Sequence, residues 1–287
     1  MSKKSKRINT IPKRERRINT VVEIALILLT LIWFIPIYYL IVTTFKSPQE
    51  ATAHPLALPK EWVFSNYVSA WKNMQYPRAF GNTLFITACS VFLIVILGSM
   101  AGYALARTKT KWGNRVFLFF LCGLMVPFQM NIISLYRIVK GLGLMNSVFA
   151  VILVNTAINL PQSIFLSKEF ITGTVPMELE EAADIDGTTP IGKFFRIVLP
   201  LMKPVMSTTV IISTLNVWNE FMTPLLFIQS RQNDVILQEV SRNIGQFATD
   251  WTAMFPMLML GVLPLMIFYL FMQKYIISGV AAGAVKG

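Results

Sequence analysis

Residues 175–204 read VPMELEEAADIDGTTPIGKFFRIVLPLMKP and interrupt a chain that otherwise consists largely of long apolar runs. This stretch predicts two short helices joined by a turn. Pro176 suits a first helical turn, and Gly187 suits the left-handed residue that ends a helix. Thr189 then caps a second helix that is expected to close near Pro200.

The first of these helices has one face centred on two alanines. Its spacing of i, i+3, i+4 and i+7 is that of a single helical face. The face consists of Leu179, Ala182, Ala183 and Asp186. Small side chains at its centre would let another surface approach the backbone closely. Three acidic residues complement the positive start of the helix: Glu178, Glu180 and Glu181.

The composition predicts a membrane protein. Of 287 residues, 54% are hydrophobic and only 14% are charged, so the excess apolar surface needs lipid. Six blocks are long enough to cross a hydrocarbon core of about 30 Å as helices, which satisfy their own backbone hydrogen bonds. They are Val21–Phe45, Phe80–Ala106, Val116–Tyr136, Ser147–Ser167, Val205–Ile228 and Ala253–Gln273, and only Glu23 and Glu220 are charged within them.

Basic residues indicate the orientation of these blocks. Of the 26 Lys and Arg residues, eighteen fall in the two terminal segments and the loops on the same side, and eight fall on the other side. The positive-inside rule therefore puts both termini and residues 175–204 in the cytoplasm. The net charge of +12 is explained by this asymmetry, so it requires no nucleic-acid partner; the basic N-terminal stretch suits an anchor near anionic lipid.

The motif within residues 175–204 resembles that of a known family. Glu181, Ala182 and Ala183 are followed at fixed spacing by Gly187 and then by Ile197, Leu199 and Pro200, as in the EAA loop of the membrane subunits of bacterial ABC importers. In that family the loop is a cytoplasmic coupling helix that docks in a cleft of the ATPase subunit. The resemblance implies a coupling role for Glu178, Glu181, Ala182, Ala183, Asp184, Gly187, Ile197, Leu199 and Pro200. The alternative is an ordinary amphipathic hairpin on the membrane surface.

Three more stretches resemble the sugar importers of this family. They are VPFQMNIISLY (126–136), NVWNEFMTPLLF (216–227) and QKYIISGVAAGAVKG (273–287), the last being similar to the C-terminal tail of the maltose-permease-like second subunit. The resemblance implies an all-α polytopic bundle of six transmembrane helices in the bacterial plasma membrane, with the fold of a type I-like ABC permease. It also implies a second homologous permease, a pair of ATPase subunits and an extracytoplasmic sugar-binding protein as partners.

These expectations divide the chain into five segments. They are a basic cytoplasmic tail (1–20), a first transmembrane helix (21–45), an external loop (46–79), a permease core (80–273) that contains the loop 175–204, and a cytoplasmic C-terminal tail (274–287).

Two of the apolar blocks carry polar stripes. In the fourth block Asn155, Asn159 and Gln162 share one helical face, which is expected to turn away from lipid. In the fifth block the stripe consists of Thr209, Ser213, Asn216, Glu220 and Thr223. Two roles stay open: hydrogen bonds between helices, or the lining of a polar passage whose amides suit sugar hydroxyls. Glu220 is either a functional carboxylate or one that is neutral or bonded to a neighbouring helix.

Two other patterns favour packing or the membrane interface. Gly98 and Gly102 have the small-xxx-small spacing of closely packed membrane helices. Trp62, Tyr67 and Trp71 in the external loop suit either an interfacial aromatic belt or a surface for an external protein.

The sequence shows no motif for catalysis or for binding a cofactor. It has no glycine-rich P-loop, so ATP and Mg²⁺ are expected in partner ATPase subunits and no cofactor is expected here. His54 is the only histidine, and no metal-ligand spacing or nucleophile–base pair is visible. The favoured function is a sugar or oligosaccharide importer permease. A permease for another solute, or a self-sufficient secondary transporter that uses Glu220, are the alternatives.

Overall fold

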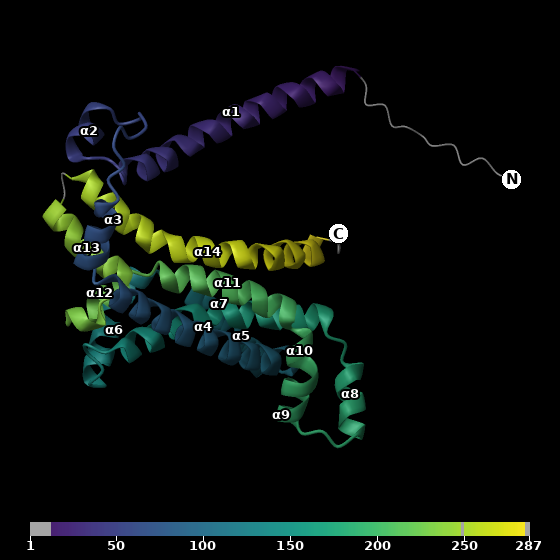
Figure 1. Ribbon diagram of the computed structural model, residues 1–287. Coiled ribbons are helices and arrows are strands. Elements are labelled where there is room, and N and C mark those ends of the chain that lie inside the picture. Colours follow the sequence, from purple (N-terminus) through teal and green to yellow (C-terminus); the bar gives the residue numbers. More distant parts are fainter. Residues whose placement is uncertain (1–12, 248–249, 285–287) are drawn as a thin grey trace.

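The computed structural model describes residues 13–247 and 250–284, and every regular element in these ranges is helical (Figure 1). In chain order the elements are α1 (Lys13–Thr43), α2 (Pro48–Ala53), α3 (Ser65–Asn73), α4 (Tyr76–Arg107), α5 (Lys111–Met125), α6 (Phe128–Gly141), α7 (Val148–Thr174), α8 (Glu178–Ile185), α9 (Pro190–Lys193), η1 (Phe194–Val198), α10 (Leu199–Leu201), α11 (Lys203–Trp218), α12 (Met222–Phe227), η2 (Arg231–Asn233), α13 (Ile236–Phe247) and α14 (Trp251–Ala284).

Four helices are long and apolar enough to cross a membrane, and the number is up to six if each of two bent pairs is one span. The four stretches are Asn19–Thr43, Tyr76–Arg107, Val148–Thr174 and Trp251–Gln273. The all-α membrane bundle expected from composition is therefore confirmed.

The third predicted block, Val116–Tyr136, is divided between two helices that meet at a bend. α5 and α6 meet at a bend of 106°. Pro127 lies at this point; it has no amide hydrogen and disfavours the helical conformation of the residue before it. Accordingly Val126 is extended, with φ −86° and ψ 115°.

The fifth predicted block, Val205–Ile228, is also discontinuous. α11 ends at Trp218 and α12 begins at Met222. Pro224 cannot donate a hydrogen bond to the carbonyl of residue 220, so a continuous helix would lose a bond in this turn. The Glu220 carboxylate consequently lies at a helix break, not in the middle of a helix.

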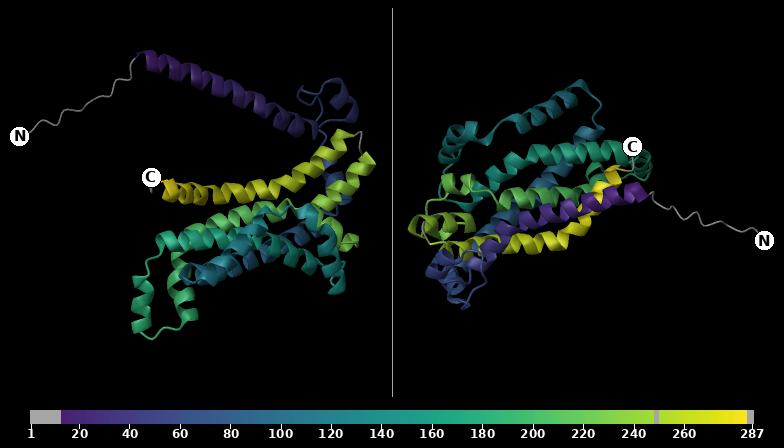
Figure 2. Two further views of the ribbon diagram at one scale, coloured as in Figure 1. Left: turned by 180° about the vertical axis from the view of Figure 1, so that it is seen from behind. Right: turned by 90° about the horizontal axis from the view of Figure 1, so that it is seen from above.

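The short helices and the ends of the long helices gather at two opposite ends of the bundle. Figure 1 shows the first turns of α1, the last turns of α14 and the pair α8–α9 at one end, and α2, α3, α12 and α13 at the other. α1 meets α14 near Tyr39, whose ring packs edge-on against Phe255 at 5.6 Å, and the two helices then diverge (Figure 2). None of the most apolar window of α1 is buried within the chain.

The helices are distributed over the five predicted segments as follows. α1 already begins at Lys13, so only residues 1–12 of the basic tail lie outside the described residues. The external loop 46–79 contains α2 and α3, and α4 begins at Tyr76. The tail 274–287 is helical as far as Ala284, and Lys286 and Gly287 lie outside the described residues.

α4 and α7 form the centre of the bundle and approach each other closely. A Cβ atom added to Gly98 would lie 2.0 Å from Ser163 Oγ, and one added to Gly102 would lie 2.5 Å from Ser167 Cβ. Ser163 Oγ also donates to the Ile94 carbonyl at 2.9 Å. The glycines therefore serve helix packing, as their spacing predicted.

The predicted external end is held together by buried charges. Glu239 of α13 is fully buried and pairs with Arg78 at the start of α4 and with Arg231 of η2. Asp234 is paired with Arg242 at 2.7 Å. The hydrogen bond to Glu239 raises the pKa of the Arg231 guanidinium, and the bond to Asp234 does the same for Arg242.

The loop 46–79, predicted to be external, folds over a buried lysine. Lys46 Nζ donates to the carbonyls of His54 and Pro55 at 2.7 and 3.1 Å. Burial lowers the pKa of the Lys46 ammonium, and the nearby Glu50 carboxylate partly offsets this shift. Trp62 and Tyr67 pack against Phe45 with ring centroids 5.2 and 5.3 Å away. This loop is a folded unit.

Candidate functional site

The EAA loop, residues 175–204, forms the predicted pair of helical arms. α8 ends at a turn in which Gly187 has φ +74°, the left-handed conformation that favours glycine. The Thr188 amide donates to the Ala183 carbonyl at 2.9 Å, which completes the end of the helix. Thr189 Oγ1 then accepts from the Gly192 amide at 3.2 Å and caps the second arm. The predictions for Gly187 and Thr189 are confirmed, whereas the prediction for Pro176 is wrong: α8 begins at Glu178, so Pro176 lies before the helix and not in its first turn.

The second arm contains a π-helical turn. α9 passes into η1, in which the Leu199 amide donates to the carbonyl of Phe194, five residues earlier. Pro200 follows and has no amide hydrogen, which weakens the regular α-helical ladder here. The arm continues through Leu201, one residue beyond the expected end, and then bends by 78° into α11.

The base of the EAA loop is packed into a hydrophobic cluster. Its buried members are Ile171, Val175, Phe194, Val198, Met202 and Val205. The two arms are also joined by an ion pair, in which Lys193 Nζ lies 2.8 Å from an Asp184 carboxylate oxygen. The cluster therefore anchors the second arm and the loop base beside α7 and α11, and the ion pair joins α8 to the second arm.

The predicted alanine face of α8 is only partly buried. Ala183 packs inward, whereas Leu179, Ala182 and Asp186 are exposed. Of the other predicted coupling residues, Glu178, Glu181, Asp184, Gly187 and Pro200 are exposed, and Ile197 and Leu199 are half-buried. The buried acidic residue of α8 is instead Glu180, which the candidate residues did not include.

Large apolar side chains are exposed on the EAA loop. Ile185 is 87% exposed and Ile191 is 71% exposed. Met177, Leu179, Phe195 and Leu201 add further exposed apolar surface. A patch of this kind, mixed with acidic residues at the tip of a projecting hairpin, is typical of a protein interface.

The polar stripes of the fourth and fifth blocks meet between α7 and α11. Asn216 Nδ2 donates to Asn159 Oδ1 at 3.0 Å, and Asn159 Nδ2 donates to the Asn155 carbonyl at 2.9 Å. Ser213 is buried, Gln162 is half-buried and Asn216 is exposed. The amides thus form an interhelical contact whose outer member, Asn216, is open at the surface of the chain.

Glu220 caps the short helix α12. One carboxylate oxygen accepts from the amides of Met222 and Thr223 at 2.7 and 3.0 Å. These amides belong to the first turn of α12, where a negative charge is favoured. This bonding explains how a carboxylate is accommodated near the bundle interior.

Asn155 faces the same region from α7. It is 2% exposed, and its Nδ2 has no hydrogen-bond partner among the described residues. A cavity of about 10 Å³ lies between Asn155, Glu220, Thr83 and Thr87. The structure therefore places two predicted site residues, Asn155 and Glu220, beside the same small cavity.

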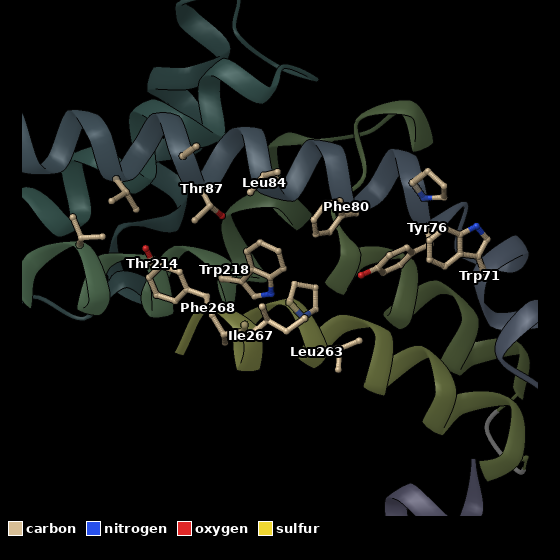
Figure 3. A pocket seen from close by; sticks show the side chains of 16 residues that line it. Trp71, Tyr76, Phe80, Leu84, Thr87, Thr214, Trp218, Leu263, Ile267 and Phe268 are labelled. Carbon is tan, nitrogen blue, oxygen red and sulfur yellow. The ribbon is translucent and has the colours of Figure 1, made fainter. Parts of the chain in front are cut away.

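A second cavity is much larger than the one beside Asn155. It has a volume of about 830 Å³ and lies between α4, α11 and α14 (Figure 3). Phe80, Trp218 and Leu263 line it, with few polar groups such as Thr87 and Thr214. This lining offers few hydrogen-bond partners for sugar hydroxyls, and none of the predicted path residues lies in it. Among the described residues there is also no cluster of three His, Cys, Asp or Glu that could hold a metal ion.

The profile of the family described as "Binding-protein-dependent transport system inner membrane component" matches residues 94–282. The chain belongs to this family. Its members are permeases of ABC importers, in which separate subunits hydrolyse ATP, so this permease is a multi-pass membrane protein and not an enzyme.

Curated relatives match this permease over most of their length. The "Melibiose/raffinose/stachyose import permease protein MelC" of Bacillus subtilis (strain 168) is 35% identical over 254 residues, which cover 88% of this chain and 92% of the relative. The "Probable starch degradation products transport system permease protein AmyC" of Thermoanaerobacterium thermosulfurigenes is 32% identical, covering 91% and 94%. The "Multiple sugar-binding transport system permease protein MsmG" of Streptococcus mutans serotype c (strain ATCC 700610 / UA159) is 31% identical, covering 96% and 100%.

A solved structure has the same fold as this permease. A chain of a bacterial ABC transporter involved in the import of the acidic polysaccharide alginate superposes with a TM-score of 0.81 at 20% identity, covering 92% of this chain and 98% of that chain. The likeness supports the ABC permease fold over nearly the whole molecule.

Proposed function

We propose that this permease is one of two homologous membrane subunits of an ATP-driven importer for a sugar or oligosaccharide. In this proposal the two permeases enclose the translocation path between them. A pair of ATPase subunits binds ATP and Mg²⁺ on the cytoplasmic side, and an extracytoplasmic sugar-binding protein delivers the solute.

The single observation that carries the proposal is the EAA loop. Its motif lies on a projecting hairpin whose tip exposes Ile185 and Ile191 to a degree that is unusual for large apolar side chains. An ATPase subunit is the proposed partner of this surface. The docked positions are Glu178, Glu181, Ala182, Ala183, Asp184, Gly187, Ile197, Leu199 and Pro200.

The sugar class is supported by the relatives. MelC, AmyC and MsmG are named for the import of melibiose, raffinose and stachyose, of starch degradation products, and of multiple sugars. We extend this substrate class to the present permease without choosing one sugar.

The proposed orientation has both termini and the EAA loop in the cytoplasm of a bacterial cell. The excess of basic residues on that side supports it. The exposed apolar length of α1 suits lipid and a second permease as neighbours.

The proposed path lining comes from the amide contact between α7 and α11. It comprises Asn155, Asn159, Gln162, Ser213, Asn216 and Glu220. Exposed Asn216 is the member best suited to meet a solute, because its amide can both donate and accept hydrogen bonds.

The proposal is tested by co-expression with the companion subunits and reconstitution in liposomes. Sugar uptake is expected only when ATP, the ATPase pair and the binding protein are all present. Uptake by the isolated chain would support a secondary transporter instead. ATP-dependent uptake of a different solute class, with no response to sugars, would support the role as an importer permease. It would contradict the proposed sugar substrate.

A further inference from the structure

Glu180 on α8 has contacts that none of the other acidic residues of the EAA loop has. We propose that Glu180 is a positioning residue that locks the EAA loop to the end of α4, so that a displacement of the loop moves α4 directly. The inference rests on the proposed function, because it describes how a displacement of the EAA loop by a docked ATPase subunit would reach α4.

Two side chains of α4 hold the Glu180 carboxylate. Tyr103 donates its hydroxyl to Glu180 Oε2 at 2.6 Å, and Arg107 Nε donates to Glu180 Oε1 at 2.7 Å. Arg107 Nη2 also donates to the Val175 carbonyl at 3.0 Å, at the point where α7 ends. The three residues Tyr103, Arg107 and Glu180 form what we call the α4 lock.

Burial makes the α4 lock more than a surface ion pair. Glu180 is 4% exposed, whereas its neighbours Glu178 and Glu181 are exposed. An exposed pair contributes little, but a buried carboxylate is costly unless its oxygens are bonded. Both oxygens of Glu180 are bonded here. Separation of α8 from α4 would therefore leave a charge without partners in a partly dry environment.

The covalent chain alone does not join the loop to α4. The loop follows α7 at one end and precedes α11 at the other, and α4 is 73 residues away in sequence at the Arg107–Glu180 contact. The α4 lock supplies a hydrogen-bonded connection from α8, beside the apolar contact of the second arm, in which the Phe194 ring lies 5.4 Å from the Tyr103 ring. Because Gly98 and Gly102 hold α4 tightly against α7, a moving loop then displaces α4 and α7 as one body.

The test measures how many solute molecules are imported per ATP hydrolysed by the reconstituted importer. Glu180→Gln, Tyr103→Phe and Arg107→Gln each remove part of the lock. We expect assembled complexes that still hydrolyse ATP, with a fall in the transport ratio of about tenfold for Glu180→Gln, the size expected for one hydrogen bond to a charged group. Glu169→Gln on α7, an exposed carboxylate paired with Lys168 at 3.1 Å, is the matched control and should leave the ratio unchanged.

A double variant separates a lock from two independent effects. Glu180→Gln combined with Arg107→Gln should lower the ratio no more than the worse single variant, because both remove the same contact. Tyr103→Phe, which deletes only one hydroxyl, guards against loss of folding in the charge variants. The proposal would be overturned if Glu180→Gln and Tyr103→Phe both import the normal number of solute molecules per ATP. It would also be overturned if neither variant assembles with the companion subunits.

The unmodified permease is measured first, so that the two proposals fail separately. If it shows no ATP-dependent uptake with its companion subunits, the proposed function is wrong. If uptake is ATP-dependent and the lock variants keep the normal ratio, only the α4 lock is wrong.

Discussion

Asn216 on α11 donates its side-chain amide to the side-chain oxygen of Asn159 on α7 at 3.0 Å, across 57 positions of sequence. The contact joins the two polar stripes, and Asn216 remains exposed at its outer side. A purely structural amide pair would be enclosed by both helices. The open side of Asn216 favours a role in the path as well as in packing.

Asn216→Ala is therefore expected to raise the solute concentration needed for half-maximal uptake several-fold. Its effect on stability should be small, about 0.6 kcal/mol, which is the average for an interhelical hydrogen bond in a membrane. Uptake kinetics and thermal unfolding of the detergent-solubilised complex measure the two quantities. Asn219→Ala is the control, since Asn219 is also exposed but bonds only to the Leu215 carbonyl of its own helix. A loss of stability without any change in uptake kinetics would assign the pair to packing.

Substitutions in the EAA loop are expected to uncouple transport from ATP hydrolysis. Glu181→Lys reverses an exposed charge at the start of α8, and Ala182→Trp places a bulky group on its exposed face. Both should reduce uptake at least about tenfold while the purified permease remains folded. Co-purification of the ATPase with the variants checks the cause, because a docking defect should also weaken subunit association. Normal uptake with normal co-purification would contradict the coupling role.

Gly187→Val tests the turn between the two arms. A β-branched residue at φ +74° should cost about 1–3 kcal/mol of local strain and lower uptake. Gly143 also has positive φ, +69°, with open space around it, and lies outside the EAA loop. Gly143→Val introduces similar strain and should leave the amount of solute imported per ATP unchanged. Equal effects of both variants on that ratio would show that strain alone is responsible.

Gly98→Leu should force α4 away from α7. Its Cβ would overlap Ser163 Oγ, and overpacking of a tight contact costs about 1–3 kcal/mol or more. The thermal midpoint of the solubilised permease should fall by several degrees. Gly81→Leu on the same helix is the control, since nothing lies within 4 Å of a Cβ at Gly81. Equal midpoints for the two variants would contradict the close packing.

Lys46 gives the stability of the loop 46–79 a predicted pH dependence. Its pKa is lowered in the folded loop, so between that lowered value and about 10.4 the unfolded loop binds more protons than the folded one. The stability of the loop should therefore rise with pH through this window. Hydrogen exchange of residues 46–64 at several alkaline pH values measures it. Protection from exchange is measured relative to the intrinsic exchange rate at each pH. Lys46→Met should abolish the rise in this protection with pH. A rise that persists in the variant would refute the assignment to Lys46.

The parts of the structure that the sequence predicted well depend on local signals. Apolar length predicted the spans, and the turn at Gly187 and the cap at Thr189 followed from the conformations that these residues favour. The spacing of Gly98 and Gly102 predicted close packing but did not indicate which helix packs against them. Their partners Ser163 and Ser167 became known only from the fold.

The parts that were missed depend on contacts between distant residues. Glu180 looked like Glu178 and Glu181, because all three share the acidic first turn of one helix, and nothing local indicates that Tyr103 and Arg107 enclose it. The breaks at Pro127 and near Glu220 had proline signals, but the length of the apolar runs outweighed them. Proline weakens one hydrogen bond, and only the surrounding packing decides whether a helix continues through it.

The bend between Leu201 and Lys203 determines what kind of motion reaches α11. The second arm meets α11 at 78°, so a push along the arm has an axial component of only about a fifth, the cosine of that angle. The rest of the push acts sideways on the first turn of α11. A force along the second arm would therefore reach α11 mainly as a sideways load on its first turn, and α11 carries Asn216 near its opposite end.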